Sequence, residues 1–76
     1  MKKTLREFLG KYFDESTIDD DDNIFETGLV NSLFTMQLVS FLEDYYDINF
    51  ENEELDIENF KDINSIVALL EKKVNA

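Results

Sequence analysis

Apolar residues recur at helical spacing in several stretches of the chain, and no stretch shows the alternation typical of a strand. The spacing predicts three long helices and one short helix. The first two long helices cover residues 4–13 and 32–46, the short one lies near residues 57–61, and the third long helix follows an N-cap at Asn64-Ser65 and ends near residue 74. Residues 14–31 have no sustained period and are expected to form a long loop. The sequence therefore predicts an all-α fold, a small four-helix bundle with a long loop between helices 1 and 2.

Polar residues suggest where two of these helices begin. Thr4 and Glu7 have the spacing of a capping box. An apolar face follows them at helical spacing, made of Leu5, Phe8, Leu9, Tyr12 and Phe13. Asn64-Ser65 has the composition of an N-cap and is expected to start the last helix.

The helix predicted over residues 32–46 is apolar around more than half of its girth. One apolar stripe consists of Thr35, Leu38, Val39, Leu42 and Tyr46, and an adjacent one of Phe34, Leu38, Phe41 and Tyr45. Leu33 and Met36 fall outside both stripes. This is more apolar surface than a surface helix of so small a protein needs. We therefore expect another body or a ligand to cover part of it.

The predicted loop combines an acidic run with apolar residues. Asp19, Asp21 and Asn23 fit the first three ligand positions of an EF-hand calcium loop, but Ile24 stands where glycine is required and Val30 where glutamate is required. A solvated acidic loop is the favoured interpretation, so no metal site is expected. The apolar residues of the second half indicate that this part packs on the core; they are Ile24, Phe25, Leu29 and Val30.

Composition narrows the function. The chain of 76 residues is expected to form one domain, residues 1–76, and its 18 acidic against 7 basic residues give a net charge of −11. Such a charge disfavours nucleic acid and anionic membranes and favours basic protein surfaces. The chain contains no Cys and no His, and so lacks a thiolate nucleophile and the usual general base. Without these groups, the chain is not expected to be an enzyme. No targeting or membrane-spanning stretch is visible, so we expect a cytoplasmic protein. We also expect it to be a monomer.

Ser32 is the candidate for chemistry. It opens the most apolar helix, and a helix N-terminus offers unpaired N–H groups and the positive end of a dipole. A phosphate esterified to Ser32 would be stabilised there. Alternatively, Asn31 or Ser32 simply caps the helix, and helix physics alone favours this second interpretation.

The residues around Ser32 match a known motif. The segment Glu26-Thr27-Gly28-Leu29-Val30-Asn31-Ser32-Leu33, with Phe25 before it and Leu38-Val39 after it, resembles the phosphopantetheine attachment motif of acyl and peptidyl carrier proteins. The resemblance implies that Ser32 is esterified by 4′-phosphopantetheine, which a separate phosphopantetheinyl transferase installs from coenzyme A with magnesium. The thiol of this arm would then carry an acyl or aminoacyl group as a thioester. A chain without Cys or His must import its reactive group, which agrees with this interpretation.

The resemblance also implies a partner surface on the helix that follows Ser32. It comprises Asn31, Leu33, Phe34, Met36, Gln37, Ser40, Glu43 and Asp44. Asn31 replaces the Asp that usually precedes the serine, and Phe34 and Gln37 replace acids of the fatty-acid type. Glu43 and Asp44 remain as electrostatic contacts for basic partners.

The cargo stays open. The segment from Gly28 to Val39 is similar to stand-alone carriers that present unusual extender units, such as methoxymalonyl or aminomalonyl groups, in polyketide or mixed peptide–polyketide pathways. Gln37 and the segment 60–66 are similar to D-alanyl and peptidyl carriers. The implied partners are the transferase, acyl- or aminoacyl-loading enzymes, and synthases or dehydrogenases with basic docking surfaces. Two other functions remain possible: an unmodified acidic helical adaptor and a calcium-responsive module.

Overall fold

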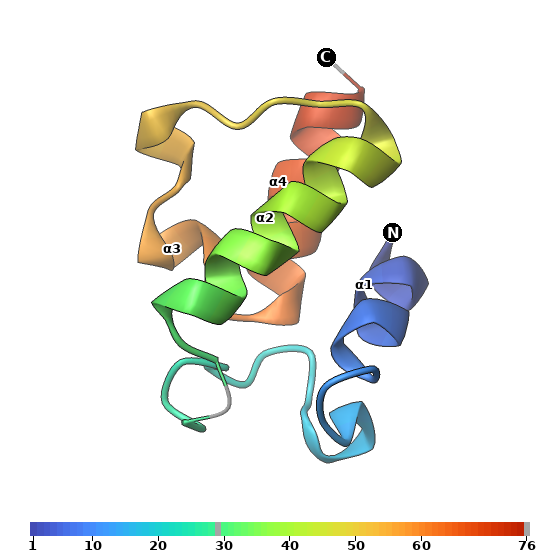
Figure 1. Ribbon diagram of the computed structural model, residues 1–76, viewed down its shortest axis with the longest axis vertical. Helices are drawn as coiled ribbons and strands as arrows, with labels where there is room; N and C mark the ends of the chain where they lie inside the picture. The colour runs from blue at the N-terminus through green and yellow to red at the C-terminus, as the bar shows by residue number, and fades with distance from the viewer. Residues whose placement is uncertain (29, 76) are drawn as a thin grey trace.

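Four α-helices make up the fold in a computed structural model that describes residues 1–28 and 30–75 (Figure 1). Their bounds are α1 Lys2–Leu9, α2 Ser32–Tyr46, α3 Ile57–Phe60 and α4 Ile63–Val74. Two short 3₁₀ turns, at Glu15–Thr17 and Asn52–Glu54, lie in the connections. No strand occurs among the described residues. The predicted all-α fold, with three longer helices and one short one, is confirmed.

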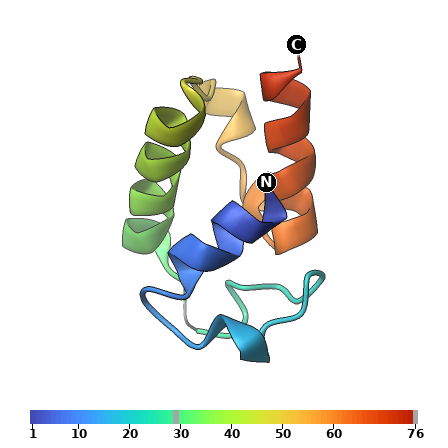
Figure 2. The ribbon, with the colours of Figure 1, turned by 90° about the vertical axis from the view of Figure 1, so that its right-hand side faces the viewer.

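Helices α2 and α4 stand side by side and run in the same direction, while α1 crosses in front of both (Figure 2). The long loop closes the end of the molecule at which α2 and α4 begin. The core lies between the three long helices, and Leu5, Leu9, Leu42, Ile63, Ile66 and Leu70 in it are completely buried. These residues occupy the positions that the helical spacing predicted.

The predicted start of α1 is wrong. The helix begins at Lys2, because the Met1 carbonyl already accepts a hydrogen bond from the N–H of Leu5. Thr4 and Glu7 therefore lie inside the helix and form no capping box. The helix also ends earlier than expected, at Leu9, although the Tyr12 N–H bonds to the Leu9 carbonyl and continues the turn.

The predicted start of α4 is wrong as well. Asp62 is the N-cap, and its carboxylate accepts a hydrogen bond of 2.7 Å from the Ser65 N–H. The N–H of Asn64 instead donates to the backbone carbonyl of Asp20 in the long loop. Asn64, which looked like a local cap, thus bonds to a distant segment of the chain.

Buried apolar side chains and one arginine hold the long loop in place. Ile18, Ile24 and Val30 are buried, and the Ile24 N–H donates to the Lys61 carbonyl at 2.8 Å. The prediction that the second half of the long loop packs on the core is therefore confirmed for Ile24 and Val30. Phe25 is partly buried, and Leu29 lies outside the described residues.

The arginine is Arg6 of α1. Its guanidinium donates to the Ile18 carbonyl at 2.8 Å, to the Asp20 carboxylate at 2.6 Å, and to both the carbonyl and the carboxylate of Glu15. Its hydrogen bonds to the carboxylates of Asp20 and then Glu15 raise the pKa of Arg6. Lys2 also binds Asp20, at 2.8 Å, and the hydrogen bonds from Lys2 and Arg6 lower the pKa of that carboxyl group.

Candidate functional site

Helix α2 is capped by Asn31, which leaves the neighbouring Ser32 free. The Asn31 side-chain oxygen accepts a hydrogen bond of 2.9 Å from the Phe34 N–H, and the Asn31 carbonyl accepts one from the Thr35 hydroxyl. Ser32 is exposed, and its hydroxyl makes no hydrogen bond within residues 1–28 and 30–75. Of the two possible caps, the helix uses Asn31. The Ser32 hydroxyl is therefore accessible to an external reagent.

The backbone that approaches Ser32 contains a tight turn. Gly28 has φ +78°, in the left-handed region that residues with a side chain rarely adopt. Apart from Gly28 and its two chain neighbours, no heavy atom of the described residues lies within 4 Å of the place where a Cβ would be, so the backbone conformation and not crowding favours glycine here.

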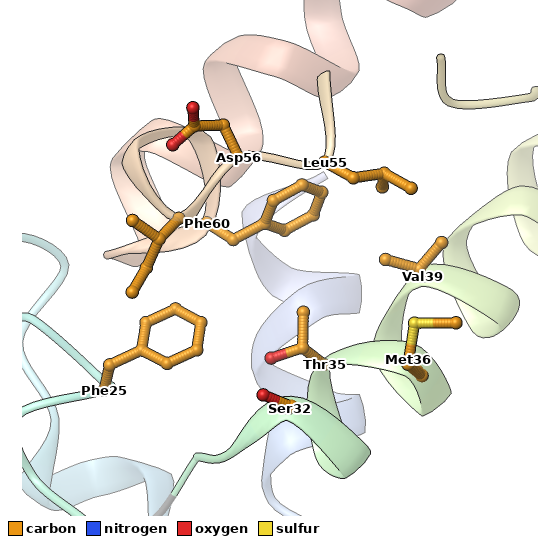
Figure 3. A pocket seen from close by; sticks show the side chains of 9 residues that line it. Phe25, Ser32, Thr35, Met36, Val39, Leu55, Asp56 and Phe60 are labelled. Atoms are coloured by element: carbon orange, nitrogen blue, oxygen red, sulfur yellow. The ribbon is translucent and has the colours of Figure 1, made fainter. Parts of the chain in front are cut away.

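An apolar groove of about 260 Å³ runs alongside Ser32 between α2 and α3 (Figure 3). Ser32, Thr35, Met36 and Val39 line its α2 side. Phe25, Leu55, Asp56, Ile57 and Phe60 line the rest. We call these nine residues the attachment groove. Its side chains are apolar except for the hydroxyls of Ser32 and Thr35 and the Asp56 carboxylate, which caps α3 by accepting the Glu58 N–H at 3.0 Å.

Three exposed apolar side chains line this groove, and a fourth, Leu33, directly follows Ser32. Leu33 is 71% exposed and Met36 61%, and Leu55 and Ile57 are exposed as well. Singly exposed apolar residues are ordinary, but four at one site indicate a surface that meets another molecule. Sequence reasoning identified Leu33 and Met36. It missed Leu55 and Ile57, because they lie in an acidic connector without sustained helical spacing.

The other predicted surface residues have different environments. Gln37, Ser40 and Asp44 are exposed on α2, as a partner surface requires. The Glu43 carboxylate is partly buried and accepts the Phe50 N–H at 2.9 Å. One prediction needs correction: Phe34 is only 9% exposed, because its ring packs against Phe8, Tyr12 and Phe13. Phe34 belongs to the core and cannot serve as a surface contact.

The acidic run is arranged differently from an EF-hand set. Carboxylate oxygens of Asp19, Asp21 and Asp22 lie within 4.8 Å of one another on the surface. The amide oxygen of Asn23 accepts the N–H groups of Phe25 and Glu26 and so shapes the loop itself.

Among the helices of the described residues, none is long and apolar enough to span a membrane.

The residues around Ser32 fit a phosphodiester-linked arm. Ser32 is exposed and its hydroxyl has no hydrogen-bond partner among the described residues, the helix N-terminus attracts a phosphate, and the adjacent groove offers mostly apolar walls. Fold and site together define a small helical protein with an exposed serine at the start of α2.

Comparison with known proteins identifies the family. Residues 1–70 match the family described as phosphopantetheine attachment site. The chain is 32% identical over 62 residues to a D-alanyl carrier protein of Lactococcus lactis subsp. cremoris (strain MG1363), covering 82% of this chain and 78% of that protein. It is 34% identical over 55 residues to a D-alanyl carrier protein of Lactobacillus acidophilus, covering 72% and 70% respectively.

The chain belongs to this phosphopantetheine-attachment family, as the motif around Ser32 implied. It is a carrier protein that bears covalently attached 4′-phosphopantetheine. Proteins of this family interact with phosphopantetheinyl transferases and loading enzymes, and are typically non-catalytic.

Proposed function

We propose that Ser32 is the residue to which 4′-phosphopantetheine is attached. The observation that carries this proposal is the division of roles at the start of α2, where Asn31 caps the helix and the exposed Ser32 has no hydroxyl hydrogen bond to any residue that the structure describes. The positive end of the α2 dipole then stabilises the negative charge of the phosphodiester.

The attachment needs an enzyme, because the chain has no His or Cys that could activate the serine. A transferase would direct the Ser32 oxygen to the phosphorus of coenzyme A that bears the pantetheine. A serine O–P bond forms, the bond to 3′,5′-adenosine diphosphate breaks, and the hydroxyl proton goes to the transferase. Once attached, the group supplies a thiol that holds cargo as a thioester.

The chain itself acts without catalysing a reaction. Residues 1–76 serve as one monomeric carrier domain that presents its cargo to loading and consuming enzymes with basic docking surfaces. Both the net charge of −11 and the exposed apolar residues around Ser32 support this role. The proposal places the exchange in the cytoplasm, where coenzyme A is available.

The cargo we favour is a small aminoacyl group. Support comes from the relatives, which are named D-alanyl carrier proteins, and from the modest size of the attachment groove. An unusual extender unit for a polyketide or mixed pathway is the alternative. Loading assays with D-alanyl and malonyl-type donors would separate the two.

Intact-protein mass spectrometry tests the attachment site. The apo-protein is incubated with coenzyme A, magnesium and a broad-range transferase, beside Ser32→Ala and the control Ser16→Ala, which removes another exposed serine hydroxyl. We expect the parent and Ser16→Ala each to gain one phosphopantetheine and Ser32→Ala to gain none. A gain in Ser32→Ala would move the site elsewhere. No gain in a folded parent would favour the adaptor function.

A further inference from the structure

Among the nine described residues that line the attachment groove, Asp56 alone is charged. It lies on the α3 side, and Figure 3 shows it across the groove from Ser32 and Thr35. Asp56 is exposed, so it stands at the mouth of the groove, where a charged group keeps part of its water. In a mostly apolar site, a few polar groups of this kind select the ligand and fix its orientation.

The Asp56 carboxylate is held in place but only partly used. Its Oδ1 accepts the Glu58 N–H at 3.0 Å, and the Asp56 carbonyl accepts the Asn59 N–H at 2.9 Å. An ionised carboxylate offers about four acceptor sites, so Oδ2 can accept further hydrogen bonds. None of the ion pairs within residues 1–28 and 30–75 includes Asp56. It can therefore pair with a cation that the chain itself does not supply.

The backbone that carries Asp56 is fixed by Glu54, two residues earlier. The Glu54 carboxylate accepts hydrogen bonds from the Lys73 ammonium and from the Glu51 N–H, both at 2.7 Å. The Glu54 carbonyl accepts one of 2.9 Å from the side-chain amide of Asn59. This wall of the groove is thus formed in advance, so a ligand does not bear the entropic cost of ordering it.

From these features we propose that Asp56 selects the cargo by binding the ammonium group of a small aminoacyl thioester. This inference rests on the proposed attachment of the arm to Ser32. An aminoacyl group such as alanyl combines a cation with a short apolar side chain, whereas a malonyl-type extender unit ends in a carboxylate. The Asp56 carboxylate attracts the first and repels the second, and the apolar walls of the groove accept the short side chain.

The covalent arm makes a weak contact sufficient. Ser32 lines the same groove, so cargo on its arm is tethered beside Asp56 at an effective concentration in the mM range. An exposed ion pair favours the bound position by up to about fivefold. Such a factor biases the cargo toward the groove over water. It is also small enough for a loading or consuming enzyme to draw the cargo out again.

Cargo that cannot hydrolyse makes this contact measurable. A broad-range transferase loads Ser32 from coenzyme A analogues that carry an alanyl group, or a propionyl group without the ammonium, through an amide in place of the thioester. Asp56→Asn removes the charge and keeps a residue that caps helices as well as Asp does; Asp56→Ser is a second capping variant. Glu53→Gln makes the same charge change at an exposed residue outside the groove.

NMR follows the protonation of the alanyl amine with pH and the contacts of the alanyl methyl group with Ile57. We expect the acid dissociation constant of the ammonium to rise about two- to fivefold in Asp56→Asn and Asp56→Ser, because a nearby carboxylate stabilises the charged form. Glu53→Gln should stay within about 1.5-fold of the parent at about 0.15 M salt, which screens distant exposed charges. Contacts of the methyl group with Ile57 should weaken with loss of Asp56 for alanyl cargo and stay unchanged for propionyl cargo.

Two results would overturn this proposal. The first is an equal dissociation constant in the parent and in whichever Asp56 variants are folded. The second is an equal rise in Asp56→Asn and Glu53→Gln, which would make the net charge of the chain the cause. Either result leaves the attachment to Ser32 standing, because intact mass shows the loaded group. If the folded parent takes up no group, the proposed function fails and the role of Asp56 with it.

Discussion

The side-chain oxygen of Asn31 lies 2.9 Å from the backbone nitrogen of Phe34 and caps α2. Replacing Asn31 with Ala should destabilise the protein by about 1 kcal/mol, because a helix donor loses its partner. Asp at this position keeps an acceptor and adds a favourable charge at the helix start, so Asn31→Asp should match or exceed the parent. Urea unfolding measures both changes. Equal stability of Asn31→Ala and the parent would show that the cap contributes nothing.

Burial of Phe34 changes what a partner-directed mutation will do. Phe34→Asp places a carboxylate among Phe8, Tyr12 and Phe13, so we expect it to unfold the chain or to cost at least about 3 kcal/mol. Gln37→Glu, at an exposed position of the same helix, should change stability by less than about 0.5 kcal/mol. Circular dichroism melts compare the two. A stable Phe34→Asp protein would contradict the core position of this ring.

Replacing Arg6 with lysine should destabilise the protein, although lysine has the same charge. A lysine ammonium cannot reach the Ile18 carbonyl, Glu15 and Asp20 together, as the planar guanidinium does. We expect Arg6→Lys to cost about 1–2 kcal/mol, a fall in Tm of roughly 4–16 °C for a domain of this size. Lys11→Arg, the reverse exchange at an exposed position, serves as the control. If Arg6→Lys melts with the parent, the ion pairs do not hold the loop.

Asp47 offers a way to stabilise the chain. It ends α2 with φ 54° and ψ 53°, the left-handed conformation that favours glycine, and it places a negative charge at the negative end of the helix dipole. Asp47→Gly should raise stability by about 1 kcal/mol. Asp47→Asn, which removes only the charge, should give a smaller gain. A loss of stability in Asp47→Gly would contradict this account.

Acid should weaken the contacts of Asp20 and Glu54. Hydrogen bonds from Lys2 and then Arg6 lower the pKa of Asp20 from its ordinary value of 3.8, while the Glu51 N–H and then Lys73 lower the pKa of Glu54 from 4.5. A lowered pKa in the folded state stabilises the fold above the ordinary value and loses this effect as the pH falls through the folded value. Above pH 5 the contribution is therefore complete.

The measurement is stability against pH in the parent and in Asp20→Asn. The difference between the two should be constant above about pH 5 and shrink below pH 4. Comparing the two chains is necessary because protonation of the other acids relieves repulsion in both. A difference that grows toward low pH would contradict the lowered pKa.

Helix positions were predictable from the sequence because apolar spacing records which side chains meet the core. The starts of α2 and α3 were predicted correctly, but those of α1 and α4 were not. Asn64 looks like a local cap and yet donates its N–H to the loop at Asp20. The clamp made by Arg6 joins residues nine to fourteen positions apart in a chain full of charges, so nothing in the pattern selects Asp20 as its partner. Such pairings depend on the folded arrangement.

For the site, sequence pattern supplied Ser32 and the α2 wall of the groove but not its opposite wall. Leu55 and Ile57 become meaningful only when α3 lies beside α2. Phe34 was misplaced because it lies on an apolar stripe that continues onto the surface, and the spacing alone does not show where burial ends. The attachment of phosphopantetheine to Ser32 itself stays a prediction.

Met36 lines both the attachment groove and a second groove between α1 and α2, and this has a consequence for how such carriers diverge. Substitutions at Tyr12 or Ser40 touch only the second groove, and substitutions at Leu55 or Ile57 touch only the attachment groove. A substitution at position 36 alters both surfaces at once. Among descendants of this chain, that residue should therefore vary more slowly than its exposure suggests.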